Sequence, residues 1–160
     1  MYEERFSVWR RWRGREDLEN LKYPGVYAIV YCADAIAGSA FSWRSDVIYI
    51  GMTNAASGLR GRLKQFDNTI VGKTGHGGAD RVRYKHRDYG VLCEGLHVAV
   101  APLKCDVSSN APTDVRIMGE VAQFEYLCFA HFVEQFGRLP EFNNKKEALK
   151  FSLTVARGAK

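Results

Sequence analysis

Residues 23–32, YPGVYAIVYC, and residues 46–52, DVIYIGM, are the two stretches that decide how this chain folds. Each is a short run of β-branched and aromatic residues bounded by Gly, Pro or Asp, which is typical of a strand. Alternation brings tyrosine and glycine to the same face of both strands. That face carries Gly25, Tyr27, Ile29 and Tyr31 on the first strand and Val47, Tyr49 and Gly51 on the second. A glycine inside a strand usually marks a close approach by backbone or ligand, so the predicted hairpin floors a candidate site.

The segments after the hairpin predict helices and one more strand. A basic helix follows the second strand, and a Gly-rich break over residues 72–78 separates it from a second helix at about 79–89. Residues 92–103 alternate as a strand and would supply the third strand of the sheet.

The longest helix is expected in the C-terminal third of the chain. Thr113 or Asp114 can N-cap it, and it runs to about Phe136, where Gly137 and Pro140 stop it. The whole chain, residues 1–160, is expected to be one α/β domain of the α+β kind: a small three-stranded antiparallel sheet flanked by helices. At 160 residues it can bury about two-thirds of its unfolded surface and needs no disulfide or metal to fold.

Two segments add to this frame. Residues 1–22 predict an N-terminal helical extension whose aromatic side chains pack on the sheet while its arginines stay in solvent; a phosphate-contacting arm is the alternative. Residues 33–45 form an insertion between the first two strands, longer than a hairpin turn requires. Its aromatic residues, Phe41 and Trp43, are expected to pack into the domain rather than to stack on bases.

The composition favours a polyanionic partner inside the cell. The net charge is +5, which is a modest indication of nucleic-acid binding. The four cysteines include no C-x-x-C pair, so neither a zinc ribbon nor a redox motif is indicated, and buried thiols in a reducing compartment are expected. Because no signal core and no membrane-spanning run is visible, we expect a soluble, cytoplasmic protein without a membrane partner.

The two strands also carry the halves of a known signature. Gly25-Val26-Tyr27 and Tyr49-Ile50-Gly51 resemble the paired motifs of the GIY-YIG nuclease family. The family continues with an apolar residue, two variable residues, and an arginine followed by an apolar residue, and Leu59-Arg60-Gly61-Arg62-Leu63 fits that pattern. It also has a glutamate on a long helix and an asparagine just after it. The resemblance, which covers roughly residues 23–144, points to Glu125 and Asn143 for these.

Periodicity separately favours Glu125 over Glu120 as the functional carboxylate. The residues three, four or seven positions from Glu125 are apolar: Met118, Val121, Ala122, Phe129 and Phe132. A carboxylate on such a stripe is costly unless a partner compensates it. Glu125 is therefore expected to be a metal ligand or half of an ion pair with Arg62, and the second alternative needs no catalysis.

Two positions leave alternatives open. Asn143 either hydrogen-bonds around the site or caps a helix over residues 145–151. The family often has a tyrosine or histidine one helical turn after its arginine, and here that position is Phe66. Either His76 or another group substitutes for it, or activity is weakened or lost.

Residues 58–88 are the electropositive part of the chain, with eight basic residues against three acids. The residues expected to contact nucleic acid here are Arg60, Lys64, Lys73, His76, Arg81, Arg83, Lys85 and Arg87. His76 has the alternative of being an ordinary polar loop residue. The Gly-rich break does not match the nucleotide-binding P-loop spacing, so contacts to a DNA backbone are favoured over ATP binding.

The resemblance implies a GIY-YIG endonuclease that hydrolyses DNA phosphodiester bonds with Mg²⁺ or Mn²⁺. Glu125 would hold the metal, and Arg62 would neutralise charge on the scissile phosphate. Tyr27 and Tyr49 would position and deprotonate the attacking water, with Asn143 completing the catalytic set. The alternative is a catalytically weak or inactive nucleic-acid-binding member, and a module that binds only protein is the third hypothesis.

Overall fold

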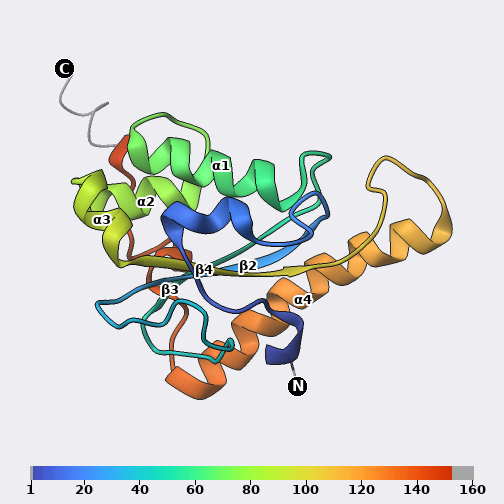
Figure 1. The fold of residues 1–160 in the computed structure, drawn as a ribbon, viewed down its shortest axis with the longest axis horizontal. Helices are drawn as coiled ribbons and strands as arrows, with labels where there is room; N and C mark the ends of the chain where they lie inside the picture. Colours follow the sequence, from blue (N-terminus) through green and yellow to red (C-terminus); the bar gives the residue numbers. More distant parts are fainter. Residues whose placement is uncertain (1, 153–160) are drawn as a thin grey trace.

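The computed structural model describes residues 2–152, which fold into a four-stranded antiparallel sheet with helices around it (Figure 1). The strand order is β1-β4-β2-β3, with β1 at Arg10–Arg11, β2 at Gly25–Tyr31, β3 at Val47–Thr53 and β4 at Leu96–Pro102. The α+β class is as predicted, but the count of three strands is wrong. The missed strand, β1, is two arginines paired with β4, and so short a basic segment has no apolar alternation to reveal it. Residue 1 and residues 153–160 of the expected domain lie outside the described residues.

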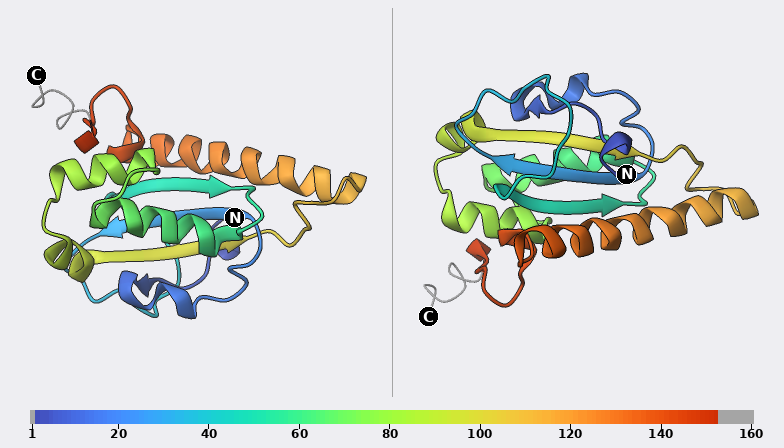
Figure 2. Two further views of the ribbon diagram at one scale, coloured as in Figure 1. Left: turned by 90° about the horizontal axis from the view of Figure 1, so that it is seen from above. Right: turned by 90° about the horizontal axis from the view of Figure 1, so that it is seen from below.

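The helices form two groups about the sheet. Figure 2 shows α1 (Gly58–Val71) and α2 (Gly77–Lys85) over one face, and α4 (Pro112–Phe136) running beside the β3 edge on the other side. The short helix α3 (Tyr89–Gly95) leads directly into β4. The described residues also contain three 3-10 helices: η1 (Glu3–Arg5), η2 (Trp12–Asp17) and η3 (Glu141–Asn143). No helix within residues 2–152 is both long and apolar enough to cross a membrane.

The register of the β2–β3 hairpin sets the geometry of the candidate site. Tyr27 lies opposite Gly51 and Ile29 lies opposite Tyr49, but Val30 lies opposite Val47, so the register shifts at this point. Because a bulge changes which side chains share a face, Val47 packs in the core on the far side of the sheet from Tyr49. The expectation that Val47 shares the tyrosine face is therefore wrong.

Two hydrophobic cores lie on the two faces of the sheet. The core beneath α1 and α2 contains Tyr27, Leu63 and Phe66, and the core beneath α4 contains the apolar side of the helix and the N-terminal and inserted aromatics. Phe41 and Trp43 are 7 % and 8 % exposed, so the packing interpretation of the insertion is confirmed. The N-terminal segment is built from η1, β1 and η2, so the helical parts of the expected extension are of the 3-10 kind and an extended piece lies between them.

Helix starts in the second half of the chain differ from the expected ones because of local capping. The His76 side chain accepts from the Ala79 amide, so α2 begins earlier than expected, and it ends at Lys85. The Asp88 side chain caps a separate helix, and residues 92–95 are therefore helical rather than extended. The long helix α4 starts with Pro at its first position and has no side-chain cap, but Gly137 ends it in the left-handed conformation as predicted.

Candidate active site

The two tyrosines of the hairpin lie side by side against bare glycines. The rings of Tyr27 and Tyr49 are 6.0 Å apart, centroid to centroid. A Cβ atom on Gly51 would lie 2.5 Å from the Tyr27 hydroxyl, and one on Gly78 would overlap the Tyr49 ring. The close approach expected at the strand glycine is thus made by a tyrosine, which fixes the Tyr27 phenol over β3.

His76 joins this pair from the start of α2. It is 1 % exposed, and its Nε2 lies 2.8 Å from the Tyr27 hydroxyl. Its Nδ1 accepts a hydrogen bond from the Ala79 amide, so the neutral ring carries its proton on Nε2 and donates to the Tyr27 oxygen. Burial lowers the pKa of His76 to about 3, and the charge of Arg62 adds to this effect. His76 is therefore a buried neutral donor that orients Tyr27.

Both phenols are held in their neutral form. Burial raises the pKa of Tyr27 well above its usual value, and the neighbouring Tyr49 adds to this rise while Arg62 opposes it. Burial likewise raises the pKa of Tyr49, again against Arg62. Tyr27 is fully buried, whereas Tyr49 is only partly so, and Tyr49 is therefore the phenol that solvent reaches.

Arg62 is the cation that α1 brings to the tyrosines. Its Nη1 donates to the Gln65 side chain at 2.7 Å, its Nε is buried without a partner, and it makes no salt bridge within residues 2–152. Arg60, two positions earlier, points away and pairs with Glu16 at the surface. The helix thus presents one arginine to each side, as its geometry requires.

Glu125 reaches the site from α4 as an unpaired carboxylate. It is half-buried beside the buried stripe of that helix, and it makes no hydrogen bond or salt bridge among the described residues. Burial raises its pKa, while the charges of Arg62 and Lys145 oppose that rise. The ion-pair alternative with Arg62 is therefore not realised here, and Glu120 is exposed.

Asn143 binds the edge of the sheet rather than capping a helix. Its Oδ1 accepts from the Ile50 amide and its Nδ2 donates to the Ile50 carbonyl, both at 2.8 Å. Because Ile50 lies between Tyr49 and Gly51, this pair of bonds positions β3 within the site. The amides of the following turn are instead capped by Asn144.

Phe66 occupies the position where the resemblance leads us to expect a polar residue. Its ring lies edge-on to His76, 4.9 Å between centroids, and packs against Tyr49 and Trp12. Phe66 therefore walls the site, and the polar group nearest to this role is His76. No local pattern around His76 in the sequence indicates that its side chain is buried, because its contact is with Tyr27, 49 positions away.

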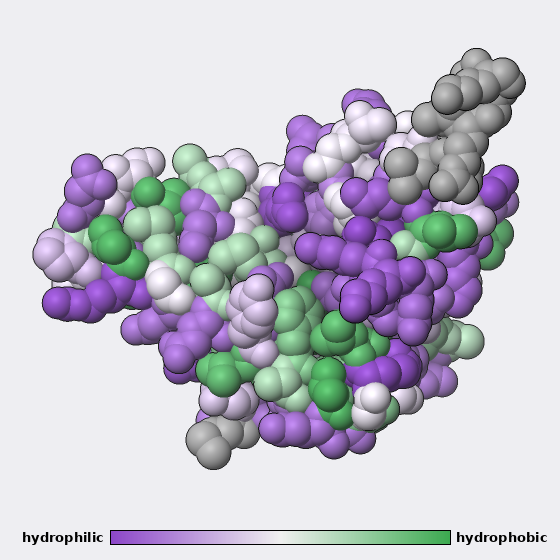
Figure 3. Space-filling model, turned by 180° about the vertical axis from the view of Figure 1, so that it is seen from behind, coloured by the Kyte–Doolittle hydropathy of each residue, from purple (hydrophilic) through white to green (hydrophobic). Residues whose placement is uncertain are grey.

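The residues expected to contact nucleic acid fall into two sets. Arg60, Lys64, Lys73, Lys85 and Arg87 are exposed, and Arg83 is half-buried. His76 and Arg81 are buried, Arg81 being 9 % exposed. Seen from behind, hydrophilic residues gather on the side of the molecule opposite the projecting end of α4 (Figure 3). DNA contact by these residues stays a prediction, and sequence reasoning missed that Arg81 lies inside the candidate site.

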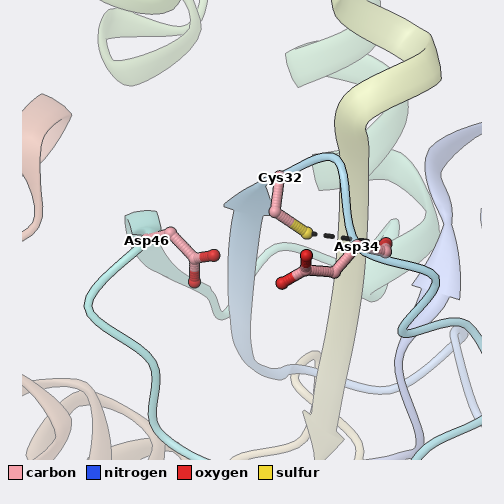
Figure 4. A group of neighbouring side chains, drawn as sticks. All are labelled: Cys32, Asp34 and Asp46. Carbon is pink, nitrogen blue, oxygen red and sulfur yellow. Dashed lines mark hydrogen bonds between the residues drawn. The ribbon is translucent and has the colours of Figure 1, made fainter.

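A second group of possible metal ligands lies at the two ends of the insertion. Cys32, Asp34 and Asp46 each offer a ligand atom within 4.8 Å of one another (Figure 4). However, Arg44 already bonds both carboxylates, at 2.7 Å to Asp34 and 2.6 Å to Asp46. The guanidinium neutralises this group, so a cation would have to displace it.

Comparisons of the chain with protein-family models, with curated proteins and with solved structures each find no match. The function is therefore argued from the residues of the site themselves. These residues are two phenols, a neutral imidazole, an unpaired guanidinium and an unpaired carboxylate.

Proposed function

We propose that this protein is a metal-dependent endonuclease of the GIY-YIG type that hydrolyses phosphodiester bonds in DNA. The observation that carries the proposal is the unpaired state of Glu125 and Arg62. The two lie close enough for the charge of Arg62 to lower the pKa of Glu125, yet they form no salt bridge in residues 2–152. Unpaired buried charges are costly, so a carboxylate and a guanidinium that do not neutralise each other indicate two separate charged ligands.

Of the two charged ligands, the cation would bind to Glu125. Mg²⁺ and Mn²⁺ prefer carboxylate oxygens and keep much of their water shell, so one half-buried carboxylate beside solvent fits such an ion. When bound, the ion would supply a Lewis acid and lower the pKa of a bound water. Asn143 would hold β3 in place beside it.

The anionic ligand, the scissile phosphate of DNA, would bind to Arg62. A guanidinium near the scissile phosphate stabilises the negative charge that grows as water attacks phosphorus and the bond to the leaving oxygen breaks. Either phenol would have to lose its own proton before it could accept one from the attacking water; burial disfavours that loss, and the charge of Arg62 favours it. Tyr49 is the phenol that solvent reaches, and the N–H of His76 orients the buried Tyr27 phenol that packs against it.

The test is cleavage of supercoiled plasmid DNA with Mg²⁺ or Mn²⁺, compared between wild type, Glu125→Ala and Glu120→Ala. Glu125→Ala should lower the cleavage rate by at least about a hundredfold, because the metal ligand is removed. It should leave DNA affinity largely intact, because the basic surface is unchanged. Glu120→Ala, at an exposed position on the same helix, should cleave as wild type does. Wild-type turnover in Glu125→Ala would refute the proposal.

The second candidate is a protein that binds DNA without cutting it. Full burial of Tyr27 and the apolar Phe66 wall favour this alternative, because both leave fewer polar groups for a water molecule. The same assay separates the two functions. A non-catalytic binder would retain DNA in a mobility-shift gel and would leave the plasmid intact at every metal concentration.

A further inference from the structure

Arg81 is a buried cation without a counter-charge. It is 9 % exposed, its Nη1 donates to the Gly77 carbonyl at 3.1 Å, and its Nε is buried without a partner. It forms no salt bridge with any residue of the described chain. The neighbouring acid, Asp80, is engaged elsewhere, since it accepts from the Ser152 amide and hydroxyl. A buried guanidinium in this state is destabilising unless an anion joins it.

The location of the Arg81 guanidinium adds to this cost. Through its bond to Gly77 it lies at the N-terminus of α2, the positive end of the helix dipole, where a cation is unfavourable. A Cβ atom on Gly77 would lie 3.7 Å from Arg81 Nη1 and 3.5 Å from the ammonium of Lys150. Two cations and a helix N-terminus therefore meet at a glycine that leaves the backbone uncovered.

This basic cluster borders the candidate active site. Gly78, the next residue, lies so close to Tyr49 that a side chain there would overlap the ring. Arg81 also acts electrostatically on Tyr49 and on His76, two of the groups on which Arg62 acts. Two arginines thus reach the same polar groups from α1 and α2 with no acid paired to either among residues 2–152. A negative ligand beside both side chains would offset the two positive charges.

We propose that Arg81, Lys150 and the Gly77–Gly78 start of α2 form a seat for a second phosphate of the DNA strand, next to the one that Arg62 contacts. The inference rests on the proposed function and adds to it the residues that align the strand. A guanidinium offers planar paired donors that match phosphate oxygens, and a helix N-terminus offers amide donors to the same group. Arg81 acts as a positioning residue for the reacting phosphate.

The first test measures binding of inorganic phosphate to the metal-free protein by calorimetric titration. Arg81→Gln should weaken phosphate binding about tenfold or more, and Arg81→Lys should largely retain it. Arg138→Gln, which changes an exposed arginine that donates to the Ser45 carbonyl, should bind as wild type does. Loss of a buried unpaired charge should leave Arg81→Gln at least as stable as wild type in thermal unfolding. Equal phosphate binding by wild type and Arg81→Gln would overturn the seat.

The second test uses DNA with a neutral methylphosphonate beside the cleaved bond. Wild type should cleave this substrate at least tenfold more slowly than normal DNA, and Arg81→Gln should lose nothing further on it. Undiminished cleavage of normal DNA by Arg81→Gln would refute the positioning role while leaving the endonuclease intact. Arg81-dependent phosphate binding in a protein that cleaves no DNA would instead refute the endonuclease and retain the anion seat.

Discussion

Two carboxylates, Asp67 and Glu125, lie beside arginines and aromatic rings, and they differ in one respect. Asp67 accepts hydrogen bonds from Trp12 at 2.7 Å and Tyr89 at 2.9 Å, and it pairs with Arg15 at 3.1 Å. Glu125 has no such partner within residues 2–152. A carboxylate beside an arginine thus holds two segments together at Asp67, whereas the carboxylate of Glu125 is left without a hydrogen-bond or ion-pair partner among those residues.

The difference shows how a charged cluster can be interpreted. The Arg15 and Asp67 side chains are only 14 % and 17 % exposed, so their interaction is weakly screened and holds η2 against α1. Glu125 and Arg62 have no such charged partners among the described residues, and their partial burial makes an unpaired charge unfavourable. A ligand of opposite charge would offset that cost. A charged group whose partners are all present, such as Asp67, stabilises the fold. A charged group without partners in the described chain, such as Glu125, is a candidate for binding a ligand.

The strongest expected contrast is between the two arginines of α1. Arg62→Ala should lower the single-turnover cleavage rate by roughly 10²–10³-fold, as the loss of a transition-state donor does. Arg60→Ala should lower DNA affinity modestly, because it removes an exposed residue that, within residues 2–152, forms a salt bridge with Glu16 alone. Equal rates for the two variants in the same kinetic assay would mean that both arginines serve the same surface role.

Asp67, the carboxylate that has its full set of partners, should contribute to the free energy of unfolding. Asp67→Asn keeps the size of the side chain but removes the charge that three donors share, so we expect a loss of about 2 kcal/mol in the free energy of unfolding. Glu125→Gln should leave that free energy unchanged or higher, because it removes an unpaired charge. Urea titrations of the two variants measure both values. A larger loss for Glu125→Gln would reverse the distinction between the clusters.

The buried imidazole predicts a pH dependence of stability. The pKa of His76 is about 3 in the folded protein and about 6.5 when unfolded, so the unfolded state binds more protons between these values. Its contribution is complete above pH 6.5 and is lost as the pH falls toward 3, by about 1.4 kcal/mol per pH unit.

Urea unfolding at pH 7 and pH 5 measures this loss, which should be smaller in His76→Gln. Burial also lowers the pKa values of His86 and His97, so a slope of the same sign should remain in that variant. The titration of the His76 ring can also be followed directly in the wild-type protein by nitrogen NMR, which needs no substitution. A His76 titration midpoint near pH 6 would contradict the buried neutral ring.

The smallest effect is expected at the basic residues around the C-terminal end of α2. Replacing Arg83, Lys85 and Arg87 together by Ala, with Arg81 left in place, should weaken binding to all DNA sequences about equally. The slope of log affinity against log salt should fall by roughly one unit for each phosphate that the variant no longer neutralises. Fluorescence anisotropy at several salt concentrations measures it. A strong, salt-insensitive preference for one sequence that survives this change would place recognition elsewhere.

Sequence reasoning predicted those parts of the molecule that depend on local pattern. Alternation predicted β2, β3 and β4, and the 3.6-residue period separated Glu125 from Glu120. The hairpin faces were predicted up to the bulge, which depends on pairing between strands rather than on either strand alone.

The remaining features depend on contacts between distant segments. The bond between His76 and Tyr27 joins residues 49 positions apart, and the bonds between Asn143 and Ile50 span 93 positions. Arg81 lies in a sequence that reads as a solvated basic helix, and its burial follows only from how α2 packs against α1 and η3. No spacing rule within one segment encodes these contacts.

The bond pair between Asn143 and Ile50 also affects how the molecule meets other copies of itself. β3 is an outer strand, and an outer strand exposes amides and carbonyls that can recruit a further strand and start aggregation. An asparagine side chain carries the same donor and acceptor as a peptide group, so at Ile50 it takes the place of a neighbouring strand. The residue that steadies the candidate site thus also blocks strand addition at this point of the sheet.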